Sequence, residues 1–209
     1  SSDNMIVKLM SPNYYKGISA YWFKEEIEEI ILINDSLGYD INSGLLEDLI
    51  MNSEYVKKAE LYLDVEDVMN VFIYLRQPFI KVLRNNKIYY CDDEGVLLPE
   101  LRVGKDNFLV LTGDWEKQDM KNLLDLIKRI YNNSMLNKLI GGVHYDKNQG
   151  YTLSSKLCDL GIVLGKVPVI DNQTLDMIEV FSVFLSENIG CEYCKAINLK
   201  YDNQIICLK

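Results

Sequence analysis

Histidine is almost absent from this chain: His144 is the only one among 209 residues. Zinc sites built from two or three histidines are therefore excluded, and a mixed site would need distant cysteines to converge on His144. A hydrolytic triad would have one candidate base, and no Gly-x-Ser-x-Gly elbow occurs. We expect no catalytic residue, no metal and no cofactor, and we interpret His144 as a surface or half-buried strand residue.

Long apolar runs are also missing. No stretch approaches the roughly 18 uninterrupted apolar residues of a membrane span, and the start, Ser1 to Asn4, lacks the anatomy of a signal peptide. Taken alone, the sequence predicts a soluble segment. Position 1 is not Met, so an anchor or signal further upstream stays an open alternative.

Basic residues are outnumbered, with 22 Lys and Arg against 31 Asp and Glu and a net charge of −9. This balance disfavours nucleic acid as a partner, because binding to phosphates needs clustered Lys and Arg. The acidic residues are spread along the chain rather than gathered in a tail, which favours a role in solubility. A hydrophobic share of 48% is ample for the core of one or two domains.

Two short motifs resemble functional sites. Asp92-Asp93-Glu94 gathers three carboxylates, but adjacent residues in a tight turn point in different directions and lack the alternation of a calcium loop. The string from Gly161 to Lys166 resembles a phosphate loop. However, its glycines are too close together and no Ser or Thr follows the lysine. We interpret the first motif as a solvated turn and the second as strand ends.

The five cysteines are too few for a disulfide scaffold, and their odd number leaves at least one unpaired in a monomer; they are Cys91, Cys158, Cys191, Cys194 and Cys207. Cys191 and Cys194 have thioredoxin-like spacing, yet they follow a predicted helix instead of opening one, as the redox motif does. A disulfide within this pair, or from either cysteine to Cys158 or Cys207, is compatible with the sequence. A thiol oxidoreductase using Cys191 and Cys194 is one alternative function.

Hydrophobic periodicity predicts a compact α+β module before Pro78. Its order is strand, helix, helix, strand, strand, with the last two forming an antiparallel hairpin. The predicted elements are a strand at 5–8, a helix at 19–32 capped by Ser19, a helix at 45–51 preceded by Asn42, and strands at 59–63 and 68–75.

Beyond Pro78 the signals become closely spaced strands with helices between them. This pattern predicts a β-rich domain with packed helices. Its predicted strands are 79–83, 88–91, 96–98, 107–113, 141–145, 150–153 and 161–165, and its predicted helices are 115–132, capped by Asp114, and 172–185, capped by Asn172.

The chain ends with two short strand signals around an Asp-Asn turn. The last run, Asn203 to Leu208, has no charge and no proline. A terminal strand is a candidate open edge, whose unpaired N–H and C=O groups can capture another chain. Two interpretations follow: the strand only closes a sheet, or it accepts a partner strand.

Several strings, in this order and spacing, resemble one family. They are 52–62, the Leu75-Arg76-Gln77-Pro78-Phe79 exit, the turn and strand at 89–99, Val110-Leu111-Thr112-Gly113, and 197–207, which is the most similar. The chain is similar to the extracytoplasmic part of the bacterial cell-division protein FtsQ, also called DivIB, in its Bacteroidota form.

This resemblance implies an α+β fold with a POTRA module in residues 1–78 and a β domain in residues 79–209. It implies a non-enzymatic scaffold at the division septum, in the periplasm, anchored by a single inner-membrane span upstream of Ser1. The implied partners are other divisome proteins, above all FtsB and FtsL, with no nucleic acid and no small-molecule substrate.

The resemblance also implies a binding site, because the final strand of the family accepts a strand from FtsB by β-augmentation. Carried over by position, two residues would flank the contact and six would supply main-chain hydrogen bonds. The flanking residues are Lys200 and Tyr201, and the others are Asn203, Gln204, Ile205, Ile206, Cys207 and Leu208.

One further alternative shares the first module: a POTRA-bearing factor of outer-membrane assembly or secretion. Such a protein should continue into more POTRA repeats or a barrel, and no second copy of the strand-helix-helix-strand-strand pattern occurs in the sequence. Cys191 and Cys194 also depart from the family, which has aromatic residues at these positions.

Overall fold

The computed structural model describes residues 4–39, 42–103, 107–166, 170–186, 193–201 and 204–209. The chain forms two compact units, one of Ser1–Pro78 with Val96–Asp106 and one of Phe79–Gly95 with Asn107–Lys209. Each unit has its own cluster of buried apolar side chains, and no described residue belongs to both clusters. Helices and strands occur in both units, which confirms the predicted α+β class.

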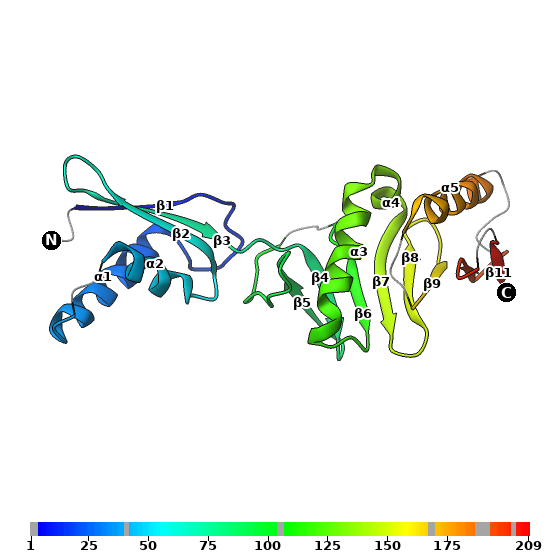
Figure 1. Ribbon diagram of the computed structural model, residues 1–209, viewed down its shortest axis with the longest axis horizontal. Coiled ribbons are helices and arrows are strands. Elements are labelled where there is room, and N and C mark those ends of the chain that lie inside the picture. The colour runs from blue at the N-terminus through cyan, green and yellow to red at the C-terminus, as the bar shows by residue number, and fades with distance from the viewer. Residues whose placement is uncertain (1–3, 40–41, 104–106, 167–169, 187–192, 202–203) are drawn as a thin grey trace. The chain divides into compact units, whose positions relative to one another are not determined.

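The first unit is a three-stranded sheet with two helices on one face (Figure 1). The strand order is β1-β3-β2, with β1 (Met5–Leu9) parallel to β3 (Met69–Leu75) and β2 (Val56–Leu63) antiparallel to it. The helices are α1 (Ala20–Ser36) and α2 (Ser43–Met51). The predicted order of strand, helix, helix, strand and strand is confirmed.

Helix α1 begins as predicted and ends later. The Ser19 hydroxyl accepts the Trp22 N–H at 3.0 Å and caps the first turn. The predicted helix ends at residue 32, whereas α1 continues to Ser36. In this last turn the Asn34 side chain donates to the Ile30 carbonyl at 2.8 Å.

The core of this unit forms where the two helices meet the sheet. Both helices turn their apolar side chains toward the strands, as the 3.6-residue periodicity predicts. The buried side chains include Phe23, Ile27, Leu46, Ile50, Val56, Val71 and Ile73.

The second unit is built on an eight-stranded mixed sheet with the order β11-β10-β9-β8-β7-β6-β4-β5. The pairs β4–β6, β6–β7 and β9–β10 are parallel, and the others are antiparallel. The strands are β4 Ile80–Arg84, β5 Lys87–Cys91, β6 Val110–Gly113, β7 Ile140–Asp146, β8 Gly150–Ser155, β9 Gly161–Gly165, β10 Ala196–Asn198 and β11 Ile206–Leu208.

Helices pack on this sheet and supply much of its buried cluster. They are the 3-10 helix η2 (Lys117–Asp119), α3 (Met120–Asn132), α4 (Ser134–Leu139) and α5 (Asn172–Ser186). Helix α4 was not predicted, because six residues are too few to show a period. Leu123, Ile127 and Ile130 of α3 are buried together with Ile178 and Phe181 of α5.

Both predicted helix caps in this unit are wrong by one or two residues. Glu116, not Asp114, forms a capping box with Asp119 at the start of η2. Asp171, not Asn172, accepts the Thr174 N–H at 2.8 Å. In each case a neighbouring carboxylate reaches the free N–H groups of the first turn.

The segment Val96–Asp106 differs most from its prediction. Val96 to Leu98 form no strand, and the whole segment clusters with the first unit instead of the second. Its backbone is engaged there, since the Arg102 N–H donates to the Tyr14 carbonyl at 2.7 Å. This segment therefore pairs with residues near Tyr14, far away in the chain, which the apolar run at 96–98 does not reveal.

Candidate functional site

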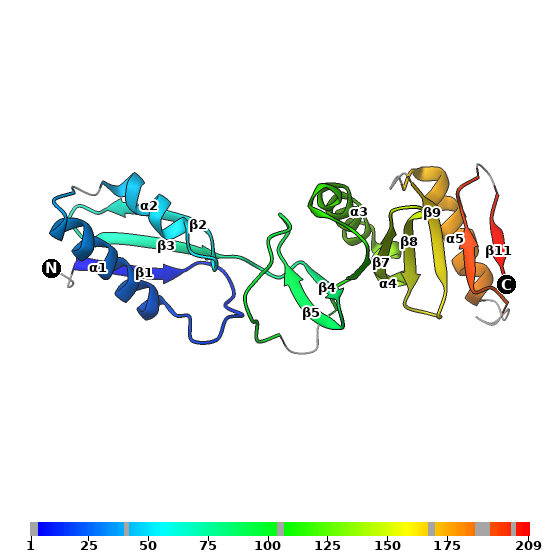
Figure 2. The same cartoon turned by 90° about the horizontal axis from the view of Figure 1, so that it is seen from below.

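Strand β11 lies at one end of the eight-stranded sheet, beside the C-terminus (Figure 2). It pairs antiparallel with β10, Cys207 opposite Ile197 and Ile206 opposite Asn198. Within the described ranges, no strand pairs with the other side of β11. A strand in this position offers a row of backbone N–H and C=O groups to another chain.

Strand β10 joins β11 to the rest of the sheet. It pairs in parallel with β9, and its central side chain, Ile197, is completely buried. The Leu199 N–H extends the ladder by donating to the Val163 carbonyl at 2.9 Å. The edge strand is therefore attached to the core of the second unit.

A disulfide between Cys194 and Cys207 fastens β11 to the segment that precedes β10. The two Cα atoms are 5.5 Å apart and the cysteines are 13 residues apart in sequence. Alongside it, the Lys195 N–H donates to the Leu208 carbonyl at 2.8 Å. This bond selects one of the pairings that the sequence left open, and it argues against a redox disulfide between Cys194 and Cys191.

The other described cysteines offer no reactive thiolate either. Burial, and then the charge of the adjacent Asp92, raises the pKa of Cys91 to about 12, so this thiol is protonated at neutral pH. Cys158 is disulfide-bonded. Cys191 lies outside the described residues.

An apolar pocket of about 240 Å³ opens beside β11. Its walls come from α5, from the segment before β10 and from β11 with the residue preceding it. The lining residues are Val180, Phe181, Tyr193, Cys194, Ile205 and Cys207. The pocket was not predicted from the sequence, although the exposed Val180 shows that a second side of this helix is apolar.

The predicted site residues fall into a turn and a strand. Lys200 and Gln204 belong to the turn, where their N–H groups donate to the Asn198 side chain at 3.0 Å and to the Tyr201 carbonyl at 3.2 Å. The strand itself is shorter than the predicted run and begins at Ile206. Asn203 lies outside the described residues.

A comparison with known families covers the second unit almost completely. Residues 77–208 match the family described as FtsQ/DivIB, C-terminal related. The chain belongs to this family. No curated protein matches the chain. FtsQ/DivIB proteins are non-enzymatic proteins of bacterial cell division, so membership confirms the predicted resemblance and places this chain among division proteins.

In this FtsQ/DivIB-related chain, the remaining residues considered as possible sites belong to strands and a turn. The exposed His144 lies 2.9 Å from the Thr112 hydroxyl, ring nitrogen to oxygen, across strands β7 and β6. The turn predicted at Asp92-Asp93-Glu94 is present, but the prediction that it is solvated is wrong for Asp92, which is buried and accepts the Glu94 N–H at 3.0 Å. The residues from Gly161 to Gly165 form strand β9.

The described part of the FtsQ/DivIB-related chain lacks two kinds of feature. No cluster of three or more His, Cys, Asp or Glu side chains there could hold a metal ion. None of the helices described is long and apolar enough to cross a membrane.

Proposed function

We propose that this chain is a periplasmic scaffold of the division machinery, and that β11 accepts a strand from an FtsB-type partner. The observation that carries the proposal is the position of β11 at the end of the sheet, with one side unpaired within the described residues. The family supports the division role. We further propose that the scaffold recruits FtsL together with FtsB at the septum. A single membrane span upstream would anchor it in the inner membrane.

Recognition at such an edge has two parts. Main-chain hydrogen bonds give affinity, and pockets for alternate side chains give specificity. The apolar pocket lined by Ile205 and Cys207 lies where a side chain of an added strand could be buried. The disulfide of Cys207 orders β11 before the partner arrives, which lowers the entropy lost on binding.

We assign the first unit to the POTRA type on its order of strand, helix, helix, strand and strand. In this proposal it contacts other division proteins. Its two helices leave one face of the sheet uncovered (Figure 1).

The test uses a peptide with the C-terminal periplasmic sequence of the FtsB homologue from the same genome. Ile206 is the residue of β11 that pairs with Asn198 of β10, so the N–H of the residue before it, Ile205, faces away from β10. Ile205→Pro removes this outward donor and fixes φ at the start of β11, so we expect the affinity measured by calorimetry to fall by at least about tenfold. The matched control is Ile88→Pro in β5, the strand at the other end of the same sheet, which should bind normally. Unchanged affinity in a folded Ile205→Pro protein with its disulfide intact would refute the proposal.

A further inference from the structure

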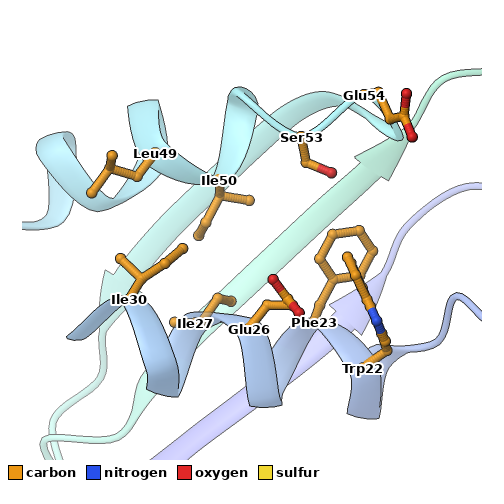
Figure 3. Close-up of a pocket in the computed structure, with 9 residues that line it drawn as sticks. All are labelled: Trp22, Phe23, Glu26, Ile27, Ile30, Leu49, Ile50, Ser53 and Glu54. Carbon is orange, nitrogen blue, oxygen red and sulfur yellow. The ribbon is translucent and has the colours of Figure 1, made fainter. Parts of the chain in front are cut away.

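Helices α1 and α2 of the first unit enclose an open groove of about 330 Å³ (Figure 3). Its floor is apolar: Phe23 and Ile27 of α1 and Ile50 of α2 are buried there. Ile30 and Leu49 are half-buried and extend the apolar surface along the two helices. A partner side chain placed here would be removed from water on several sides.

Two carboxylates and an indole ring surround this apolar floor. Glu26 and Glu54 are exposed, and Trp22 is half-buried at one end (Figure 3). The lining contains no Lys or Arg, and in the described part of the chain no basic side chain pairs with Glu26 or Glu54. The groove therefore presents negative charge without an internal counterion.

The charge of the surrounding region reinforces this polarity. Residues 1–78 contain fourteen acidic and six basic side chains, a net charge of −8, whereas residues 79–209 contain seventeen and sixteen, a net charge of −1. Almost all of the excess acidity of the chain thus belongs to the first region. Such a field raises the local concentration of cationic partners and speeds their association.

The groove is less suited to other ligands. A volume of 330 Å³ lies at the lower end of the range of small-molecule pockets, about 300–1,000 Å³, and its acidic rim would repel phosphate-bearing cofactors. An acidic surface is also repelled by the anionic lipids of a membrane. A basic protein segment satisfies both the apolar floor and the rim.

We propose that the groove between α1 and α2 binds a basic amphipathic segment of a partner protein. Its apolar side chains pack on the half-buried Ile30 and Leu49, as in helix-in-groove recognition. A Lys or Arg of the segment lies over the Trp22 ring, within reach of Glu26 and Glu54, where cation–π attraction and ion pairing combine. This surface belongs to the first unit and does not depend on the function proposed for β11.

The test uses the full chain with Trp115→Phe, which leaves Trp22 as the only tryptophan. The probe is a short amphipathic helical peptide of leucine and lysine, compared with a counterpart that has glutamate in place of each lysine. We expect the lysine peptide to shift the Trp22 emission and to bind at least about tenfold more tightly than the glutamate peptide. Equal binding of both peptides would overturn the proposal.

Matched variants separate the groove from the general acidity of the unit. Glu26→Gln with Glu54→Gln should weaken binding of the lysine peptide by about tenfold. The control, Glu29→Gln with Asp48→Asn, removes the same charge from exposed positions of α1 and α2 outside the groove, and should weaken binding by less than about twofold. Equal losses of affinity in the two double variants would show that the peptide is attracted by net charge alone, and would refute binding in the groove.

A second pair tests the apolar floor. Leu49→Ser removes a lining side chain, whereas Leu45→Ser changes a side chain of the same helix that is 42% exposed and outside the lining. Only Leu49→Ser should reduce the affinity. The proposal would also fail if vesicles of phosphatidylglycerol and phosphatidylcholine shifted the Trp22 emission while the lysine peptide did not.

Discussion

The two units offer different surfaces to a partner. In the first, two helices with acidic side chains form an apolar groove. In the second, which is nearly neutral in charge, the sheet ends in a strand whose outer side is unpaired in the described part of the chain. A groove recognises side chains and charge, whereas a strand edge recognises backbone. One chain can therefore hold two partners that do not compete for the same chemistry.

The largest expected effect is the loss of stability when a glycine of the second unit is replaced by alanine, compared with the same change in the first unit. Gly113, in β6, has φ +107°, and a Cβ there would lie 1.9 Å from the Tyr145 carbonyl oxygen. Gly38, after α1, has φ +76° with nothing within 4 Å of its Cβ position. We expect Gly113→Ala to cost more than about 3 kcal/mol and Gly38→Ala about 1 kcal/mol, measured by urea unfolding. Similar costs would show that the Tyr145 carbonyl moves aside for the added Cβ.

The disulfide is the next largest difference. Replacing both Cys194 and Cys207 by Ser should destabilise the second unit by about 3 kcal/mol, because the closed loop of the unfolded chain is lost. Trp115 reports this unit and Trp22 the first, so only the Trp115 transition in urea should move. The same variant should bind the FtsB-type peptide more weakly. An unmoved Trp115 transition would mean that β11 is held by its hydrogen bonds alone.

Salt should separate the two proposed interfaces. Binding of the lysine peptide by the first unit should weaken by about tenfold between low and high ionic strength, because exposed charges are screened. Binding of the FtsB-type peptide to β11 should change far less, since it rests on main-chain hydrogen bonds. Calorimetry at two NaCl concentrations measures both. Equal salt dependence of the two affinities would contradict the proposal that the first unit binds through charge and the second through backbone hydrogen bonds.

The smallest expected effect is on the pH dependence of stability, and it concerns an aspartate in a hairpin turn of each unit. Backbone N–H groups of Val68 and Glu66 lower the pKa of Asp64 in the β2–β3 turn, and those of Gln149 and Asn148 lower the pKa of Asp146 in the β7–β8 turn. A lowered pKa stabilises the fold above the unfolded-state value, about 3.9, and this stability is lost as the pH falls through the folded-state pKa.

Asp64→Asn and Asp146→Asn should therefore each reduce stability at neutral pH and remove part of its acid dependence. Urea unfolding at neutral and acid pH, followed by Trp22 and by Trp115, measures the two units separately. A variant that keeps the full acid sensitivity of its unit would show that other carboxylates control it.

The sequence was most informative where the hydrophobic periodicity and the helix-capping residue indicate the same element. The stripe of Phe23 and Ile27 with the Ser19 cap located α1, and the alternation in β2 and β3 located their hairpin. Neighbouring carboxylates compete for the same N–H groups, so the caps at Glu116 and Asp171 could not be distinguished from those predicted at Asp114 and Asn172. The pairing of Cys194 with Cys207 depends on the strand order, which spacing does not reveal.

The two surfaces that we propose as binding sites were predictable from the sequence to different degrees. An uncharged run ending at Leu208 suggested an edge, because a terminal strand has few ways to be covered. The groove was not predictable from the sequence, since Glu26 and Glu54 are brought to one place only in the folded unit. The pocket beside β11 also combines segments that are far apart in the chain, from Val180 to Cys207.

The disulfide of Cys194 and Cys207 also bears on proteolysis. It encloses Lys200 and the exposed Tyr201, where trypsin can cleave. A single cut after Lys200 would leave β11 covalently attached through Cys207, so the two fragments should stay linked until a reductant is added. The strand that we propose as the docking edge would thus survive a break in its own connecting loop.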